Sequence, residues 1–191
     1  MRVTMILAAL LFAAPAAAQP RPPAGPTRAD PKQAETEAML DALRKAPSEQ
    51  ASAMIEGKLR QAWVNAAGPA AAILIGRGVR NLNNNAEADA LDDFEAALTL
   101  EPNFTEGFAR RAAARVALGE YRAALVDIQE ALKREPRHFG ALKILSRLAE
   151  QRGDLEGALK AWEKVLEIAP RTSGAAERML ELRQKLEGEG T

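Results

Sequence analysis

The stretch from Phe104 to Pro170 decides the fold, and it reads FTEGFARRAAARVALGEYRAALVDIQEALKREPRHFGALKILSRLAEQRGDLEGALKAWEKVLEIAP. It belongs to a pattern with a period of 34 residues. Three sets of residues keep this spacing: Pro102, Pro136 and Pro170; Gly119 and Gly153; Ala90, Ala124 and Ala158. A period of this length is typical of stacked repeats. The sequence therefore predicts a repeat array.

Each period carries the signals of two helices joined by a turn. A proline closes each second helix, because the residue before a proline is sterically pushed out of the helical region. Gly119 and Gly153 mark two of the turns, where glycine adopts the left-handed backbone that ends a helix. Asn83-Asn84-Asn85 stands at the remaining turn, and Asn tolerates that backbone best after Gly. We expect three helix-turn-helix units, at residues 71–104, 105–138 and 139–172.

Helical patterns also flank the three units. Residues 32–68 predict two helices, the second capped by Ser48, and we expect this pair to pack on the first unit and shield its open end. Whether the pair is a degenerate fourth repeat stays open. Residues 173–188 predict an amphipathic capping helix, since a terminal repeat otherwise exposes its stacking face to water. Because Ala is abundant and aromatic residues are scarce, we expect an all-α fold.

The N-terminus carries the signals of export. Residues 1–18 combine Arg2 with a short apolar run and small final residues, which predicts a signal peptide cleaved before Gln19. The alternative is a membrane anchor, which would need roughly 20 apolar residues. Residues 19–31 are rich in proline and predict a disordered linker, the alternative being a ligand for another domain. We expect an exported protein of the bacterial periplasm, with no later membrane span.

Composition argues against catalysis and against several kinds of ligand. The 191-residue chain has no cysteine, which excludes disulfides, thiolate metal sites and thiol catalysis. Basic and acidic residues number 26 each, so net charge gives no reason to expect nucleic acid as a partner. We expect His138, the single histidine, to be partly exposed between two units, the alternative being a pH-sensitive partner contact. We expect no enzyme activity, no cofactor and no metal site.

The units resemble those of tetratricopeptide-repeat proteins, which alternate large and small residues at fixed positions. The matching residues of the second unit are Phe108, Ala112, Gly119, Tyr121, Ala124, Ile128, Ala131 and Pro136. Those of the third unit are Leu142, Ser146, Gly153, Leu155, Ala158, Trp162, Val165 and Pro170. The first unit diverges most. The resemblance covers over half of the mature chain and implies a right-handed superhelical array of three units, with the N-terminal pair and the capping helix at its ends.

The resemblance also implies a binding groove. In such arrays the first helix of each unit lines a concave face, and the second helix forms the convex back. Positions two, five, nine, twelve and thirteen of the first helices face the groove. They hold Ile75, Val79, Leu82 and Asn83 in the first unit, Ala109, Ala113 and Val116 in the second, and Lys143, Arg147, Glu150 and Gln151 in the third. The expected groove is apolar at one end and charged at the other.

The first helices are rich in basic residues and the second helices in acidic ones. This suggests a groove that grips an acidic segment or a C-terminal carboxylate, with Arg making bidentate contacts. The family's well-known peptide clamps use Lys and Asn at positions five and nine of the first unit, where this chain has Ile75 and Val79. A carboxylate grip would therefore come from Lys143 and Arg147, with Arg110 as a further candidate.

Three other arginines allow two interpretations. Arg77, Arg111 and Arg115 either add to the basic groove or pair with acidic residues of the second helices while burying their stems. The function expected from the whole sequence is a non-catalytic scaffold that binds a segment of another protein. The alternative is a structural or assembly component of the cell envelope that acts through self-association or through its capping helices. The oligomeric state stays open.

Overall fold

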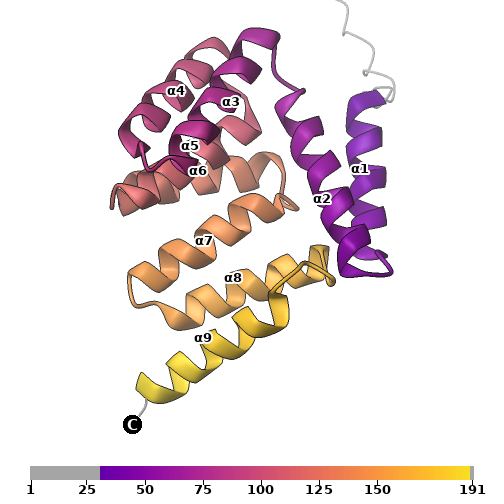
Figure 1. The fold of residues 1–191 in the computed structure, drawn as a ribbon, viewed down its shortest axis with the longest axis vertical. Helices are drawn as coiled ribbons and strands as arrows, with labels where there is room; N and C mark the ends of the chain where they lie inside the picture. Colours follow the sequence, from indigo (N-terminus) through magenta and orange to yellow (C-terminus); the bar gives the residue numbers. More distant parts are fainter. Residues whose placement is uncertain (1–30, 190–191) are drawn as a thin grey trace, which may run out of the picture.

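The computed structural model describes residues 31–189, and this part of the chain folds into nine α-helices without a strand (Figure 1). The expected all-α fold is confirmed. The predicted signal peptide, and the predicted linker up to residue 30, lie outside the described residues. The helices are α1 (Pro31–Arg44), α2 (Glu49–Val64), α3 (Pro69–Asn83), α4 (Glu87–Leu100), α5 (Thr105–Ala117), α6 (Tyr121–Arg134), α7 (Phe139–Gln151), α8 (Leu155–Ile168) and α9 (Ala175–Glu189).

Three antiparallel pairs, α3–α4, α5–α6 and α7–α8, stack side by side (Figure 1). The turn inside each pair has one residue with left-handed backbone at the same place in the period: Asn85 with φ 56°, Gly119 with φ 78° and Gly153 with φ 76°. This confirms the expectation that Asn replaces Gly in the first turn. The residue before each repeat proline is extended, with ψ between 73° and 92°, and that conformation ends α4, α6 and α8.

Small residues set how closely the helices of a pair approach. Ala90, Ala124 and Ala158 are fully buried. In the first pair the close approach also needs Gly78, because a Cβ added there would lie 2.4 Å from the Cε1 atom of Phe94. In each unit a small residue on the first helix, Gly78, Ala112 or Ser146, stands at the position that corresponds to a bulky one on the second. The interior is therefore packed by matched volumes.

The N-terminal pair does not shield the open end of the first unit, so that expectation is wrong. The pair α1–α2, which we call the N-terminal hairpin, packs instead against α5 and α8, far along the array (Figure 1). Its apolar residues Leu59 and Trp63 cluster with Phe139 at the start of α7 and Ala169 after α8. Ile73, on the first helix of the array, is left 70% exposed. The hairpin packs against the third unit because the apolar side chains that it covers there are larger than those at the open end of the array.

The last helix, α9, closes the other end. Met179 and Leu182 of α9 are buried against Leu142 and Val165 of the third pair. No helix within residues 31–189 combines the length and the apolar character needed to cross a bilayer. The described part of the chain is thus a stack of helical pairs with α9 on one end and the hairpin across its side.

Candidate functional site

The structure divides the groove residues implied by the sequence into three groups. Asn83, Arg147 and Gln151 are exposed; Val79, Leu82, Arg110, Ala113, Lys143 and Glu150 are half-buried; Ile75, Ala109 and Val116 are buried. The accessible positions lie mainly in the C-terminal halves of α3, α5 and α7. That part of the concave surface is the candidate interface.

The assignment of Ile75, Ala109 and Val116 to an accessible groove is wrong. Ile75 is 1% exposed in the core cluster of the first pair, and Ala109 and Val116 are 2% and 1% exposed. These positions are covered because α3, α5 and α7 pack on one another along the array. A neighbouring first helix therefore takes the place that a partner would occupy.

Arg77, Arg111 and Arg115 pair inside the array and do not join the groove. Arg77 pairs with buried Asp93 of α4. The Arg111 Nη2 atom lies 2.7 Å from Asp127 Oδ1, and the Arg115 Nη1 atom lies 2.8 Å from Asp127 Oδ2. Hydrogen bonds from two guanidinium groups satisfy the carboxylate of Asp127, which is 1% exposed. The choice that the sequence left open is settled in favour of internal pairing.

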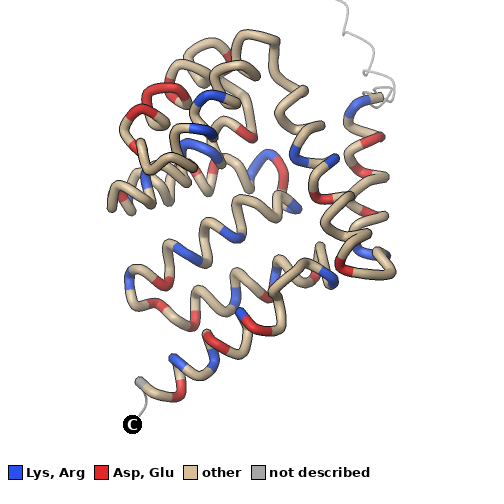
Figure 2. Tube along the Cα trace, in the orientation of Figure 1, with Lys and Arg blue, Asp and Glu red and all other residues tan. Residues whose placement is uncertain are grey.

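Basic residues occur on all three first helices, α3, α5 and α7 (Figure 2), and those of α7 are Lys143 and Arg147. Lys143 and Arg147 stand one turn apart, so their side chains share one face of the helix. Arg147 is exposed and makes no ion pair or hydrogen bond with another residue of the described part of the chain. Lys143 lies over the rings of Phe139 and Trp162, with Nζ 5.4 and 5.6 Å from the two ring centroids. A cation held between aromatic faces is suited to receive a carboxylate.

Lys143 pairs with Glu56 of the hairpin at 3.3 Å, and the remaining charged groove candidates are also occupied within the chain. The Arg110 Nε atom donates to Glu106 Oε1 at 2.6 Å. Glu150 accepts from Lys185 of α9 at 2.6 Å and also pairs with Arg178. Burial would raise the pKa of Glu150, but Lys185 and Arg178 outweigh it and hold that pKa below its usual range. Arg147 is therefore the cation best placed to meet a partner.

His138 is buried, contrary to the expectation of partial exposure. It is 2% exposed and stacks on Trp63 of the hairpin, with ring centroids 4.1 Å apart. The Ala141 N–H donates to Nδ1, so the ring proton sits on Nε2, which donates to Glu106 Oε2 at 2.9 Å. Burial would raise the pKa of Glu106, but the hydrogen bond from His138 and the charge of Arg110 outweigh it and lower that pKa. The histidine holds the hairpin in place.

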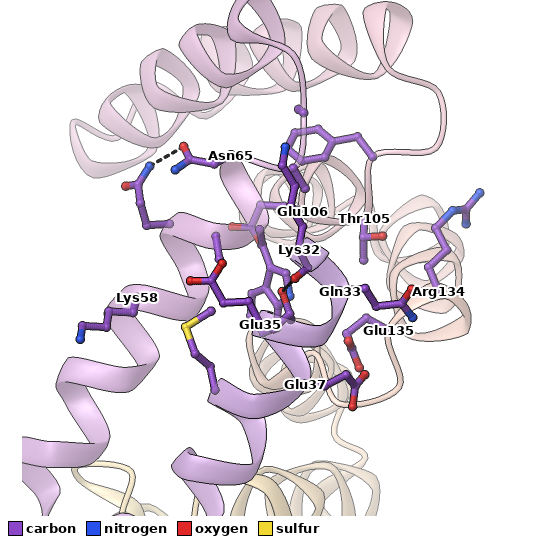
Figure 3. Close-up of a pocket in the computed structure, with 18 of the residues that line it drawn as sticks. Lys32, Gln33, Glu35, Glu37, Lys58, Asn65, Thr105, Glu106, Arg134 and Glu135 are labelled. Atoms are coloured by element: carbon purple, nitrogen blue, oxygen red, sulfur yellow. Dashed lines mark hydrogen bonds between the residues drawn. The ribbon is translucent and has the colours of Figure 1, made fainter. Parts of the chain in front are cut away.

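A pocket of about 1010 Å³ separates the rest of the hairpin from the turns that join the units (Figure 3). Glu35 and Glu37 of α1 face it on one side, and Thr105 and Glu135 of the turns face it on the other. Trp63 contributes to its floor. The hairpin thus leaves an open space beside its apolar contact with Phe139 and Ala169.

Sequence reasoning predicted a buried face with Leu59 and Trp63 on this helix but missed the burial of Ser52 and Glu56 and the contact with the third unit. Ser52, Glu56, Leu59 and Trp63 are all buried and lie on one face of α2. The sequence did carry a signal for this contact: a Glu lies at helical spacing with Leu and Trp on an apolar face. A carboxylate is buried only where it has partners, so this pattern indicates a polar contact inside an apolar interface. Its partner residues could not be read from that spacing.

Comparison with known proteins identifies relatives. The chain is 32% identical over 137 residues to a TPR repeat-containing protein of Rhizobium etli. The match covers 72% of this chain and 67% of that protein. The Sgt2 TPR domain from Aspergillus fumigatus has 25% identity and a TM-score of 0.59, over 65% of this chain and 83% of that one. The first TPR of Spaghetti, bound to the HSP90 peptide SRMEEVD, has 22% identity and a TM-score of 0.56. The match covers 61% of this chain and 93% of that one. No family model matches the chain.

Proposed function

Because the chain belongs to the tetratricopeptide-repeat family, we propose that it is a non-catalytic scaffold that binds a segment of a partner protein along the concave surface of α3, α5 and α7. The observation that carries the proposal is Arg147, an exposed cation without a partner among the described residues, one turn from Lys143. Val79 and Ala113 offer half-buried apolar positions on the other first helices. Apolar contacts would supply affinity, and the cations would orient the segment.

The partner segment is acidic or ends in a free carboxylate. Arg binds carboxylates with two parallel hydrogen bonds, and a charge-assisted bond is stronger than a neutral one. The peptide SRMEEVD bound by the first TPR of Spaghetti carries three acidic residues, which supports this class of ligand by analogy. Since Ile75 and Val79 replace the Lys and Asn of the family's best-known clamps, the grip here rests on the third unit.

The scaffold acts outside the cytoplasm, in a bacterial periplasm. Support comes from residues 1–18, whose short apolar run and small final residues have the form of a cleaved signal peptide. The mass of the protein recovered from the periplasm tests this. We expect a chain that begins at Gln19; an intact Met1 in a membrane fraction would contradict cleavage.

Site-specific photo-crosslinking tests the binding surface. A photoreactive side chain at Ala113 or Gln151, on the concave surface, should capture a partner protein in cells. The same group at Gln129, exposed on α6, is the control position. Arg147→Glu should abolish capture, whereas Arg122→Glu, an exposed Arg on α6, should not. Equal capture at Gln129 and at the concave positions would contradict the proposal.

A second candidate function is an assembly component of the cell envelope. One observation favours it: Ile73 is exposed at the open end of the array, where Gly107 and Ala141 occupy the same place in later units and are buried by the preceding unit. Leu180 of α9 is 57% exposed at the opposite end. The two ends could stack head to tail between copies of the chain.

A further inference from the structure

The cation site of the third unit is filled by a carboxylate from the chain itself. Glu56, on α2 of the N-terminal hairpin, accepts from Lys143 at 3.3 Å and pairs with Arg60. The Thr172 hydroxyl donates to the other oxygen of Glu56 and accepts from Lys143 Nζ at 2.8 Å. Glu56 and Thr172 are buried, and Lys143 is 31% exposed. The group that holds this carboxylate belongs to the array, while the carboxylate belongs to the hairpin.

We propose that the N-terminal hairpin is a displaceable internal ligand: Glu56 occupies the carboxylate site made by Lys143 and Thr172, and an acidic partner segment competes for it. The inference rests on the proposed function, and it adds that binding is controlled by the hairpin. A partner carboxylate first meets exposed Arg147 and then reaches Lys143, one turn away on the same helix face. Exchange of one carboxylate for another leaves Lys143 and Thr172 satisfied.

The contacts between the hairpin and the array are compatible with displacement of the hairpin. It contacts the array through the Glu56 cluster, through the stack of Trp63 on His138, through the apolar cluster with Phe139 and Ala169, and through Arg137. Between these points lies the pocket of about 1010 Å³. Between the second and third pairs of the array the pocket at the turns is smaller, about 550 Å³, and fully buried alanine and aliphatic side chains pack the pairs. The hairpin thus lies beside a larger opening than the one at these turns.

The energetics of these contacts also favour exchange. Arg137 pairs with Glu37 and Asp41, which are 50% and 68% exposed, and exposed ion pairs contribute about 0–1 kcal/mol. A buried ion pair contributes little net stability, because desolvation offsets the attraction. The apolar contacts of Leu59 and Trp63 with the cluster around Phe139 must therefore hold most of the closed state. A tether of four residues, 65–68, joins the hairpin to α3 and keeps its effective concentration high, so that only a matching ligand displaces it.

A released hairpin would lose structure, which makes displacement measurable. Its helices have 14 and 16 residues, and isolated helices of this length are marginal in water. Backbone amides of α1 and α2 should therefore exchange faster with deuterium once the hairpin leaves the array. The helices α5 to α8 keep their own pair contacts and serve as an internal reference.

The test combines hydrogen exchange with binding of a decapeptide of glutamates that has a free C-terminus. We expect the peptide to increase exchange in α1 and α2 but not in α5 to α8. Glu56→Ala should increase exchange without peptide and tighten peptide binding, about tenfold if the hairpin is closed ten times as often as it is open. Glu49→Ala, which removes an exposed carboxylate from the same helix, should do neither. Lys143→Ala should release the hairpin and also abolish peptide binding.

The outcomes separate this inference from the function on which it rests. Peptide binding that depends on Arg147, leaves α1 and α2 protected and is unchanged by Glu56→Ala would overturn the inference and leave the scaffold function standing. Absence of peptide binding in both the natural chain and Glu56→Ala would overturn the carboxylate class of ligand and the inference with it. Capture by photo-crosslinking, which uses no added peptide, tests the scaffold function independently.

Discussion

At the scale of single residues, the array fills one pair of facing positions either with an ion pair or with apolar residues. In the first two units an Arg on the first helix pairs with a buried Asp on the second, Arg77 with Asp93 and Arg111 with Asp127. In the third unit Leu145 and Ala161 occupy the same places. Removing one partner of a buried pair is costly, while replacing the whole pair by apolar residues is often neutral. The chain therefore contains its own control for the cost of a buried charge.

Asp127→Ala should destabilise the protein by about 3 kcal/mol, because Arg111 would lose its carboxylate and Arg115 would keep only the exposed Glu95 and Glu120. The free energy of unfolding measured in urea checks this. The triple change Arg111→Leu, Arg115→Ala and Asp127→Ala copies the third unit and should recover most of the loss. A triple variant less stable than Asp127→Ala would contradict the explanation.

Gly78→Ala should cost about 1–3 kcal/mol, because the new methyl group would collide with Phe94. Gly57→Ala is the matched control in α2: its Cβ would meet nothing within 4 Å, so helix propensity alone should stabilise by up to about 1 kcal/mol. Adding Phe94→Ile to Gly78→Ala copies the second unit, which has Ala112 and Ile128, and should restore stability. Thermal unfolding followed by circular dichroism compares the variants.

At the scale of elements, the hairpin and α9 are attached to the array in a similar way. The hairpin and α9 each combine apolar contacts with a carboxylate that pairs across elements. Glu56 meets Lys143, and Glu150 meets Arg178 and Lys185. Removing the charge of one of these carboxylates should therefore act first on the attachment of its terminal element.

Acid should loosen α9 before it unfolds the array. The pKa of Glu150 is lower in the folded protein, since Lys185 and Arg178 outweigh burial, and the pKa of Glu181 is lowered by hydrogen bonds from the same two cations. A lowered pKa means that the stabilisation is present above the unfolded value of about 4.3 and is lost as pH falls through the folded value. Amide NMR signals of α9 should shift below about pH 4 while those of α5 stay.

Glu150→Gln gives the control for the acid prediction. It removes the titrating carboxylate and keeps the size of the side chain, so α9 should already be partly loosened at neutral pH and should respond less to acid. The exposed Glu177, also on α9 and without these partners, provides Glu177→Gln as the matched variant. Equal acid responses of Glu150→Gln and the natural chain would show that other groups hold α9.

At the scale of the whole molecule, the proposed binding surface and the proposed internal ligand belong to one chain. The array offers the concave surface with Arg147, and the hairpin lies across the side of the same array with Glu56 on Lys143. Each uncovered end of the stack exposes one large apolar side chain, Ile73 at one end and Leu180 at the other. A stable interface between proteins usually buries at least about 1,200 Å².

Light scattering across a wide concentration range should therefore give a single mass that corresponds to one chain. Ile73→Lys should leave this mass unchanged. If the mass of the natural chain rises with concentration and Ile73→Lys prevents the rise, the assembly function replaces the scaffold function. Leu100→Lys, at an exposed position away from both ends, controls for added charge.

Local features of the sequence determined the helical pairs, their register and their turns. The prolines end helices through a steric effect on the preceding residue, and Asn85, Gly119 and Gly153 adopt the left-handed backbone at the expected places. These features depend on neighbours in the chain or on the next repeat, so a period of 34 residues contains them. The buried alanines follow for the same reason.

Only the tertiary structure decided where the hairpin lies and which charged groups are free. Lys143 donates a hydrogen bond to Glu56, which is 87 residues away in the sequence. Thr172 donates to the same carboxylate across 116 residues. Periodicity shows that a face is apolar but does not say which of several apolar surfaces it will cover, because that choice depends on side-chain volumes and charges from distant segments. For the same reason Ile75, Ala109 and Val116 were assigned to the groove, although neighbouring helices bury them.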